Sequence, residues 1–221
     1  MPRETFQQEL DQLVADVIEL GAEVASSLEN AVEAMMSRDA KVVEPELGVD
    51  ARYKERGAEI ERACMILQAK QAPVARDLRV LYSAQSVTNH LVRSGALIEH
   101  ICHAIFDTAQ YDKDEDLEAV LTEMAKATRN IFDEGLGIFE DLAADRARDL
   151  QAKDDKVDLL YAEALNLIAN PPEEHGGSPE WRMRAAQMVH YLERVSDHGV
   201  GIGASTVFLV TGERMGDATK Q

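Results

Sequence analysis

Three long segments of the chain carry apolar residues at alternating spacings of three and four, the period of an amphipathic helix. The first runs from Phe6 to Met35, the second from Leu117 to Leu142, and the third from Trp181 to Leu209. No segment of comparable length alternates apolar and polar residues as a half-buried strand would. The pattern predicts an all-α protein whose longest helices have about 30 residues and measure about 45 Å.

Breaks in this pattern divide the chain into about six helices. Asp112 or Asp114 is expected to cap the fourth helix and Ser178 the sixth, because short polar side chains accept hydrogen bonds from the first turn. Pro45 and Gly48 should kink the second helix or delay its start. The breaks are Pro73, QYDKDED at 110–116, DRARD at 145–149 and NPPEEHGGSP at 170–179.

An internal repeat relates the two halves of the chain. HLVRSGALIEHI at 90–101 aligns with YLERVSDHGVGI at 191–202 at an offset of 101 residues, pairing Leu91 with Leu192, Arg93 with Arg194 and Ile101 with Ile202. Each copy falls in the third helix of its half. Together with the equal helix counts, the repeat favours two similar three-helix bundles, residues 1–110 and 111–221.

The charge balance excludes one class of partner. The chain of 221 residues has 41 acidic and 23 basic side chains, a net charge of −18. Nucleic-acid binding needs an excess of Lys and Arg, so no nucleic acid is expected as a partner. Cys64 and Cys102 lie among apolar residues, which is typical of buried thiols in a reducing compartment. With neither an apolar signal core nor a membrane span in the sequence, a cytoplasmic location is expected.

Four carboxylates form the most informative chemical pattern. Asp154 and Asp158 are four residues apart in the fifth helix, on the face that Leu165 and Ile168 are expected to turn toward the bundle interior. Glu193 and Asp197 are four apart in the sixth helix. Residues at this spacing share one helix face. If the two helices pack side by side, the carboxylates converge and need a cation or protons to offset their repulsion.

Oxygen ligands favour magnesium, calcium, manganese or ferric iron over zinc. His190 or His198 would add a nitrogen ligand. The alternative is that these carboxylates are only a solvated helix face. The Glu-x-x-His pair of di-iron bundles is absent, because His190 precedes Glu193.

The remaining polar residues point to no catalytic site. The sequence has no glycine-rich phosphate loop, no nucleophilic serine turn and no cysteine beside a basic partner, so no enzymatic activity is expected. His100 and His103 are interpreted as surface or packing residues. Arg93 and Arg194 are expected to form ion pairs, with contact to an anion as the alternative.

Three motifs in order resemble the PhoU family over nearly the whole chain. They are AKQAPVARDLRVL at 69–81, DDKVDLLY at 154–161 and VHYLERVSDHGVGIGASTVFLVTGE at 189–213. The resemblance implies two three-helix bundles, each with acidic motifs on its second and third helices that can hold metal ions or clusters. Carried over to this sequence, it assigns a metal site of the second bundle to Asp154, Asp158, Glu193 and Asp197, with iron, zinc, magnesium, manganese or calcium as the ion.

The first bundle departs from the family pattern. Aligning the motifs places Asp50 at the first acidic position and Lys54 at the second, with Val92 and Ala96 at the two positions of the third helix. Neither Val nor Ala can ligate a cation, and the Lys ammonium brings its own positive charge. The first bundle is therefore expected to bind metal weakly or not at all. The glycines at 199, 201 and 203 should loosen the last helix or admit another backbone.

The resemblance implies a regulator of phosphate uptake and phosphate-starvation signalling. Such a protein would act negatively through the ATPase subunit of a phosphate ABC transporter and a phosphate-sensor histidine kinase, and meet the membrane only through these partners. A homodimer is expected. The alternatives are an accessory protein of a phosphate transporter without ABC architecture, a carboxylate-bundle metal protein for storage or redox chemistry, and a helical scaffold without a ligand.

Overall fold

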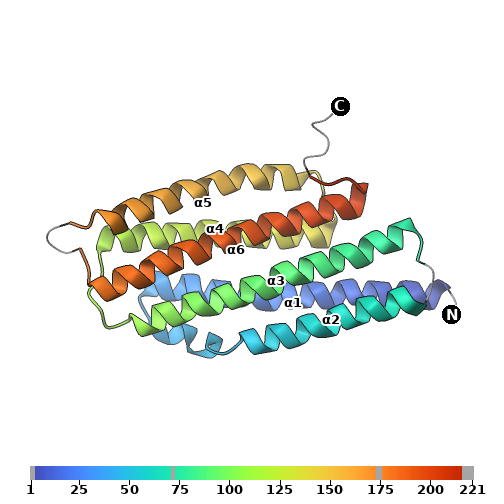
Figure 1. Cartoon of the computed structure of the whole chain (residues 1–221), viewed down its shortest axis with the longest axis horizontal. Helices are drawn as coiled ribbons and strands as arrows, with labels where there is room; N and C mark the ends of the chain where they lie inside the picture. Colours follow the sequence, from blue (N-terminus) through green and yellow to red (C-terminus); the bar gives the residue numbers. More distant parts are fainter. Residues whose placement is uncertain (1–2, 71–72, 173–175, 216–221) are drawn as a thin grey trace.

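The chain folds into two three-helix bundles, as the computed structural model of residues 3–70, 73–172 and 176–215 shows (Figure 1). Within those residues there are no strands. The predicted all-α class is confirmed. The elements are α1 (Arg3–Ser37), the 3₁₀ helix η1 (Ala40–Glu46), α2 (Asp50–Lys70), α3 (Ala75–Asp107), α4 (Glu115–Asp141), α5 (Arg146–Ala169) and α6 (Pro179–Thr211).

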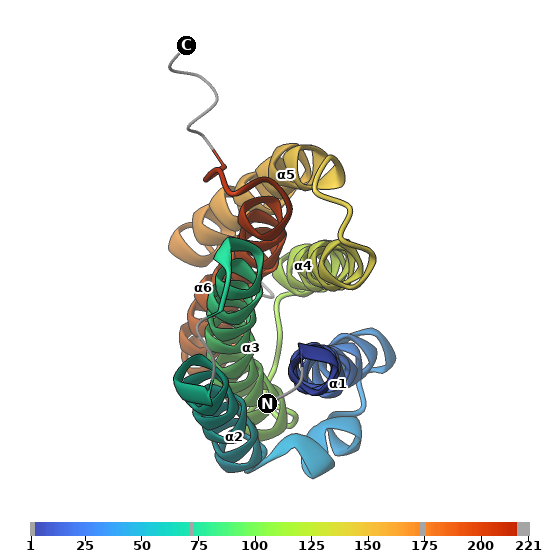
Figure 2. The same cartoon turned by 90° about the vertical axis from the view of Figure 1, so that its right-hand side faces the viewer.

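The two bundles share one hydrophobic core. Viewed along the bundle, α1, α3, α4 and α6 lie in the middle, with α2 and α5 on the outside at opposite ends (Figure 2). Helix α6 packs against both α3 and α4, and α1 packs against α4. Phe6, Phe132 and Trp181 are among the largest fully buried side chains of one continuous apolar cluster. Because α3 and α6 pack together, residues of the two repeats meet along this seam.

The predicted helix caps are present at α4 and α6. The carboxylate of Asp114 accepts a hydrogen bond from the Leu117 amide at 3.0 Å, and the Ser178 hydroxyl accepts one from the Trp181 amide at 3.1 Å. Asp112 has a different role, because its backbone carbonyl accepts the Ser178 amide at 2.8 Å. This bond fixes the start of α6 beside the start of α4.

The delayed start of the second helix is also confirmed. Pro45 lies inside η1, and Gly48 adopts a φ of 102°, so the α-helical part begins only at Asp50. The carboxylate of Glu99 on α3 accepts a hydrogen bond from the Asp50 amide at 2.6 Å. Glu99 thus satisfies one of the free amides at the beginning of α2.

The break expected at 145–149 lies a few residues earlier. Helix α4 ends at Asp141, Leu142 takes the left-handed conformation with φ 54°, and α5 already begins at Arg146. The Ala and Arg residues of DRARD favour helix and are absorbed into α5. Pro73 lies between α2 and α3 as predicted, whereas residues 173–175 of the 170–179 break are outside the described residues.

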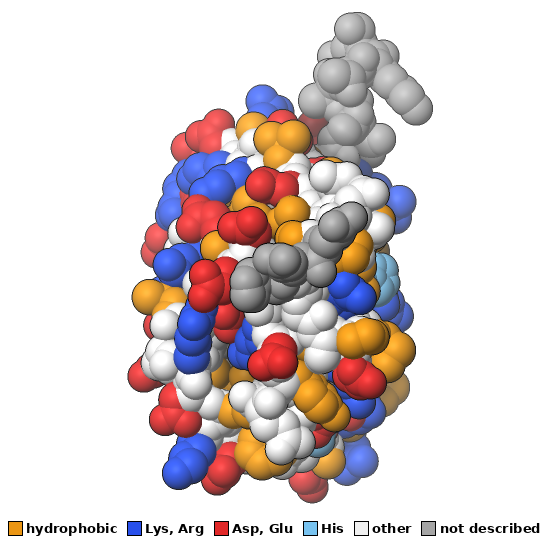
Figure 3. All heavy atoms as spheres, turned by 90° about the vertical axis from the view of Figure 1, so that its left-hand side faces the viewer, with side chains coloured by type: hydrophobic (Ala, Val, Ile, Leu, Met, Phe, Trp, Pro, Cys, Tyr) orange, Lys and Arg blue, Asp and Glu red, His pale blue; other side chains and the backbone are white. Residues whose placement is uncertain are grey.

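Charged residues link the two bundles and alternate in sign on the surface. Arg129 on α4 pairs with Glu29 on α1 at 2.5 Å, and Arg38 pairs with Glu118 at 2.7 Å. On the end of the bundle in Figure 3, acidic and basic side chains are interspersed rather than gathered by sign. In the part of the chain that the structure describes, no helix has the length and apolarity needed to cross a bilayer.

Candidate functional site

The four predicted carboxylates lie on α5 and α6, which pack against each other. Asp154 is buried, at 7% exposure, within the stripe of α5 that also buries Leu150 and Val157. Its carboxylate accepts a hydrogen bond of 2.5 Å from the Ser196 hydroxyl on α6. This bond holds Asp154 against α6 at Ser196, which lies between Glu193 and Asp197 in the sequence.

The other carboxylates are nearer to solvent. Asp158 and Asp197 are exposed and Glu193 is half-buried. The expectation for Leu165 was wrong, because this side chain is exposed and the buried stripe of α5 continues through Ala164 instead. The stripe advances by three and four residues from Leu150, so it passes through Asp154 and leaves Asp158 at its edge.

The carboxylates act on each other electrostatically. Burial raises the pKa of Asp154, the Ser196 hydrogen bond opposes the rise, and the charges of Asp197 and Asp158 add to it. Burial and then the charge of Asp197 raise the pKa of Glu193. Burial also raises the pKa of Asp197, with a contribution from Asp158 that Arg194 partly offsets. The charge of Asp158 thus acts on all three of the other carboxylates.

The side chains do not form a ready-made coordination shell. Within residues 3–70, 73–172 and 176–215, no three His, Cys, Asp or Glu side chains are grouped so that they could hold a metal ion. The donor chemistry nevertheless fits a hard cation, because all four groups offer oxygen and repel one another. Asp158 and Asp197 are exposed, so their rotamers can change without repacking the core.

The contact between α2 and α3 in the first bundle is made by different residue types. Tyr53 on α2 lies against Gly95 on α3, and Gly57 faces Val92.

At the four positions that the motifs align with the acidic cluster, the first bundle carries one carboxylate. This is Asp50, and it pairs with Lys54 at 2.5 Å. Val92 and Ala96 stand at the two positions on α3, and neither side chain can ligate a cation. The weak or absent metal binding expected of this bundle stays a prediction.

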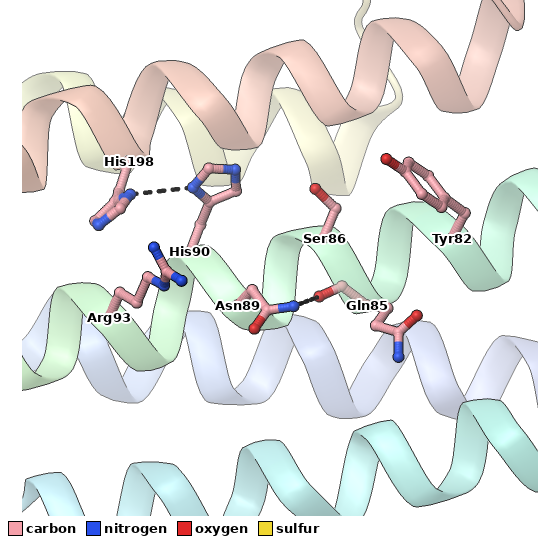
Figure 4. A pocket seen from close by; sticks show the side chains of 7 residues that line it. All are labelled: Tyr82, Gln85, Ser86, Asn89, His90, Arg93 and His198. Atoms are coloured by element: carbon pink, nitrogen blue, oxygen red, sulfur yellow. Dashed lines mark hydrogen bonds between the residues drawn. The ribbon is translucent and has the colours of Figure 1, made fainter.

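The sequence analysis missed a second polar site, at the seam of α3 and α6. The Nδ1 atoms of His90 and His198 are 3.1 Å apart, so one ring donates a hydrogen bond to the other (Figure 4). Burial lowers the pKa of His198 to about 4, and His90, Arg194 and Arg93 add to the effect. Burial also lowers the pKa of His90. A cavity of about 370 Å³ opens here, lined by Tyr82, Gln85, Ser86, Asn89, His90, Arg93 and His198.

The predictions for the other histidines and for the two repeated arginines had different outcomes. His198 faces His90 rather than the carboxylates, while His190 Nδ1 lies 3.9 Å from Glu193. His100 and His103 are surface residues, as interpreted from the sequence. Among the described residues, neither Arg93 nor Arg194 has an ion-pair partner within 4.0 Å, so the expected ion pairs are absent. Arg93, which matches Arg194 in the repeat, was a sequence signal for this pocket. His90 and His198 are 108 residues apart in the sequence, so their positions in the chain did not indicate that they meet.

This chain is similar in sequence to known proteins over nearly its whole length. A protein from Methanothermobacter thermautotrophicus named phosphate-specific transport system accessory protein PhoU homolog 1 is 29% identical, over 96% of this chain and 97% of its own length. A PhoU homolog of Clostridium acetobutylicum is 25% identical over 97% and 98%.

Two crystal structures have the same fold over nearly the whole chain. The phosphate transport system regulatory protein PhoU from Streptococcus pneumoniae superimposes with a TM-score of 0.81 at 25% identity, covering 95% of this chain and 99% of that one. PhoU from Pseudomonas aeruginosa gives 0.86 at 21% identity, covering 94% and 100%. The PhoU domain model matches residues 17–105 and 121–206, and this chain belongs to the PhoU family.

Proposed function

We propose that this chain is a non-enzymatic accessory protein that lowers phosphate uptake and phosphate-starvation signalling when phosphate is plentiful. The observation that carries the proposal is the likeness, over nearly its entire length, to proteins named as accessory to phosphate-specific transport.

The four carboxylates of α5 and α6 would hold a metal ion. Asp154 is fixed by Ser196 and provides the rigid side of the site, while Asp158 and Asp197 turn inward from solvent to complete it. Iron, magnesium, manganese or calcium suits these oxygen donors better than zinc. The ion supplies positive charge, which neutralises the cluster and attracts an acidic or phosphate group of a partner.

The partners would be the ATPase subunit of a phosphate ABC transporter and the phosphate-sensor histidine kinase, met in the cytoplasm. A chain of net charge −18 favours association with basic surfaces and speeds the encounter with them. A homodimer would present two metal sites to such an assembly.

Phosphate uptake in cells that lack their own PhoU protein tests the proposal. Expression of this chain should lower uptake of labelled phosphate in phosphate-rich medium. The double variant Asp158→Asn and Asp197→Asn should fail to do so at equal abundance. The control combines Asp149→Asn with Glu163→Gln, two exposed carboxylates of α5 outside the cluster, and should act like the native chain.

The outcomes separate the two parts of the proposal. Unchanged uptake with the native chain would refute regulation of phosphate transport by this protein. Full repression by the Asp158 and Asp197 variant would refute a role for the carboxylate cluster while leaving the regulatory role in place.

A further inference from the structure

The pocket at the α3–α6 seam has a charge opposite to that of the whole chain. Its lining includes the Arg93 guanidinium and two histidines but no carboxylate, in a protein of net charge −18. Arg93 is exposed and, within the described residues, forms no ion pair. An arginine that stays unpaired among so many acidic side chains is free to bind an anion from solution.

The rest of the lining supplies hydrogen-bond donors. Gln85 and Asn89 carry amide groups, of which one Asn89 N–H already donates to the Gln85 carbonyl. The Ser86 hydroxyl pairs with Ser205, and one histidine N–H is used between the two rings, so one ring N–H is left for a ligand. Nε2 of His198 is shielded from solvent and has no hydrogen-bond partner. In Figure 4 this nitrogen lies on the side of the ring away from His90. His198, which lines the pocket, thus carries an unsatisfied polar atom, and Arg93 brings a permanent positive charge to the same lining.

The charges around the pocket determine whether it favours an anion or a cation. Burial is the main reason why a proton on His198 is disfavoured, and His90 and the charges of Arg194 and Arg93 add to it. The two arginine charges repel a cation and attract an anion. A volume of about 370 Å³ leaves room for an anion together with its hydration.

We propose that this pocket binds a tetrahedral oxyanion, either inorganic phosphate or the phosphoryl group of a small phosphate monoester. Arg93 is the charged anchor, because its planar fork of N–H groups matches two oxygens of such an anion. The anion would lie among Ser86, Asn89 and the two histidine rings. The site is built mainly by α3, with His198 from α6, and uses none of the four carboxylates.

Gly201 keeps the pocket in shape. A Cβ atom on Gly201 would overlap the His90 ring, so the imidazole occupies space that only glycine leaves open on α6. Gly201→Ala therefore displaces His90 without changing any charge. Together with an Arg93 variant, it separates the shape of the pocket from its electrostatics.

Calorimetric titration of the full chain, freed of metal with chelator, tests the proposal with two probes, inorganic phosphate and adenosine monophosphate. The native chain should bind at least one of them. Arg93→Gln should weaken binding by roughly tenfold or more, since a charge-assisted hydrogen-bond pair is lost. Gly201→Ala should also weaken it. Arg148→Gln, an exposed arginine of α5 without an ion pair in the described residues, has the same charge change and should bind like the native chain.

Each outcome is decisive. Binding of phosphate alone identifies the free anion as the ligand, and tighter binding of the monoester identifies a phosphorylated molecule. Binding of neither probe, or equal affinity of native chain and Arg93→Gln with both folded by circular dichroism, overturns the proposal. Asp158→Asn should keep anion binding, so the result does not depend on the metal site or on regulation of transport.

Discussion

Gly135 of α4 and Gly199 of α6 meet backbone to backbone where the two helices cross. A Cβ atom on Gly135 would overlap the carbonyl oxygen of Gly199, and one on Gly199 would lie 3.0 Å from the Cα of Phe132. The close approach expected from the glycines of the last helix is thus confirmed at residue 199. It brings α6 near enough for the Thr128 hydroxyl to donate to the Leu192 carbonyl at 3.3 Å.

Gly135→Ala should therefore lower the free energy of unfolding by about 1–3 kcal/mol, because backbone rather than a side chain must move. Gly137→Ala, two residues along α4, has nothing within 4 Å of the new methyl group. There alanine should stabilise the helix by about 0.5–1 kcal/mol. Chemical denaturation of both variants measures the contrast, and equal effects at the two glycines would contradict the crossing geometry.

The hydrogen bond from Ser196 to Asp154 should be important for stability. Ser196→Ala leaves a buried carboxylate without its donor and should cost about 1–3 kcal/mol. The same substitution in an Asp154→Asn background should cost less, because an amide is easier to bury than a charge. A double-mutant cycle from urea denaturation gives the coupling energy, and a value near zero would show that the two side chains act independently.

Burial of the carboxylates, together with their mutual repulsion, should make the metal-free protein less stable as pH rises. The pKa values of Asp154, Glu193 and Asp197 are raised in the folded state, so folding favours the protonated forms. Stability from this source is present near pH 4, where unfolded carboxyls titrate, and is lost as pH rises through the raised values.

Asp197→Asn should then raise the melting temperature in chelator at pH 7, and the gain should shrink as pH approaches about 4. Thermal melts across this range measure it, with Glu163→Gln as the exposed control on α5. A lower melting temperature for Asp197→Asn at pH 7 would mean that its carboxylate stabilises the fold through a contact instead.

The two thiols should be unreactive in the native protein. Both are buried, and burial raises the pKa of Cys64 to about 11 and that of Cys102 to about 12. Because the thiolate is the reactive form, labelling at pH 8 should proceed only through unfolding. Reaction of either cysteine at the rate of a free thiol in the absence of denaturant would contradict this arrangement.

Local signals predicted much of the fold. The apolar period gave six helices, Asp114 and Ser178 cap where short polar residues precede helices, and Pro45 delays α2 as its missing amide requires. The end of α4 was predicted a few residues too late. Its left-handed position is occupied by Leu142 rather than by a glycine, the usual sequence signal for such a turn.

The sites were harder to predict because they depend on how helices rotate against each other. The spacing of the carboxylates placed them on neighbouring faces, but it did not show that Asp154 is buried and Asp158 exposed. The His90–His198 pair forms because α3 and α6 pack together. This packing joins the two repeats and could not be predicted from the residues around either histidine. The division at residue 110 and the metal site itself stay predictions.

The central claim is that α5 and α6 hold a metal ion between Asp154, Asp158, Glu193 and Asp197. Elemental mass spectrometry of the purified chain, with melting temperatures before and after chelation, tests it most directly. We predict near-stoichiometric metal whose removal lowers the melting temperature, since an ion bound only to the folded state stabilises it. Asp158→Asn should lose the metal, whereas Asp50→Asn, in the first bundle, should keep it. Absence of metal together with identical melting before and after chelation, in the native chain, would contradict the claim.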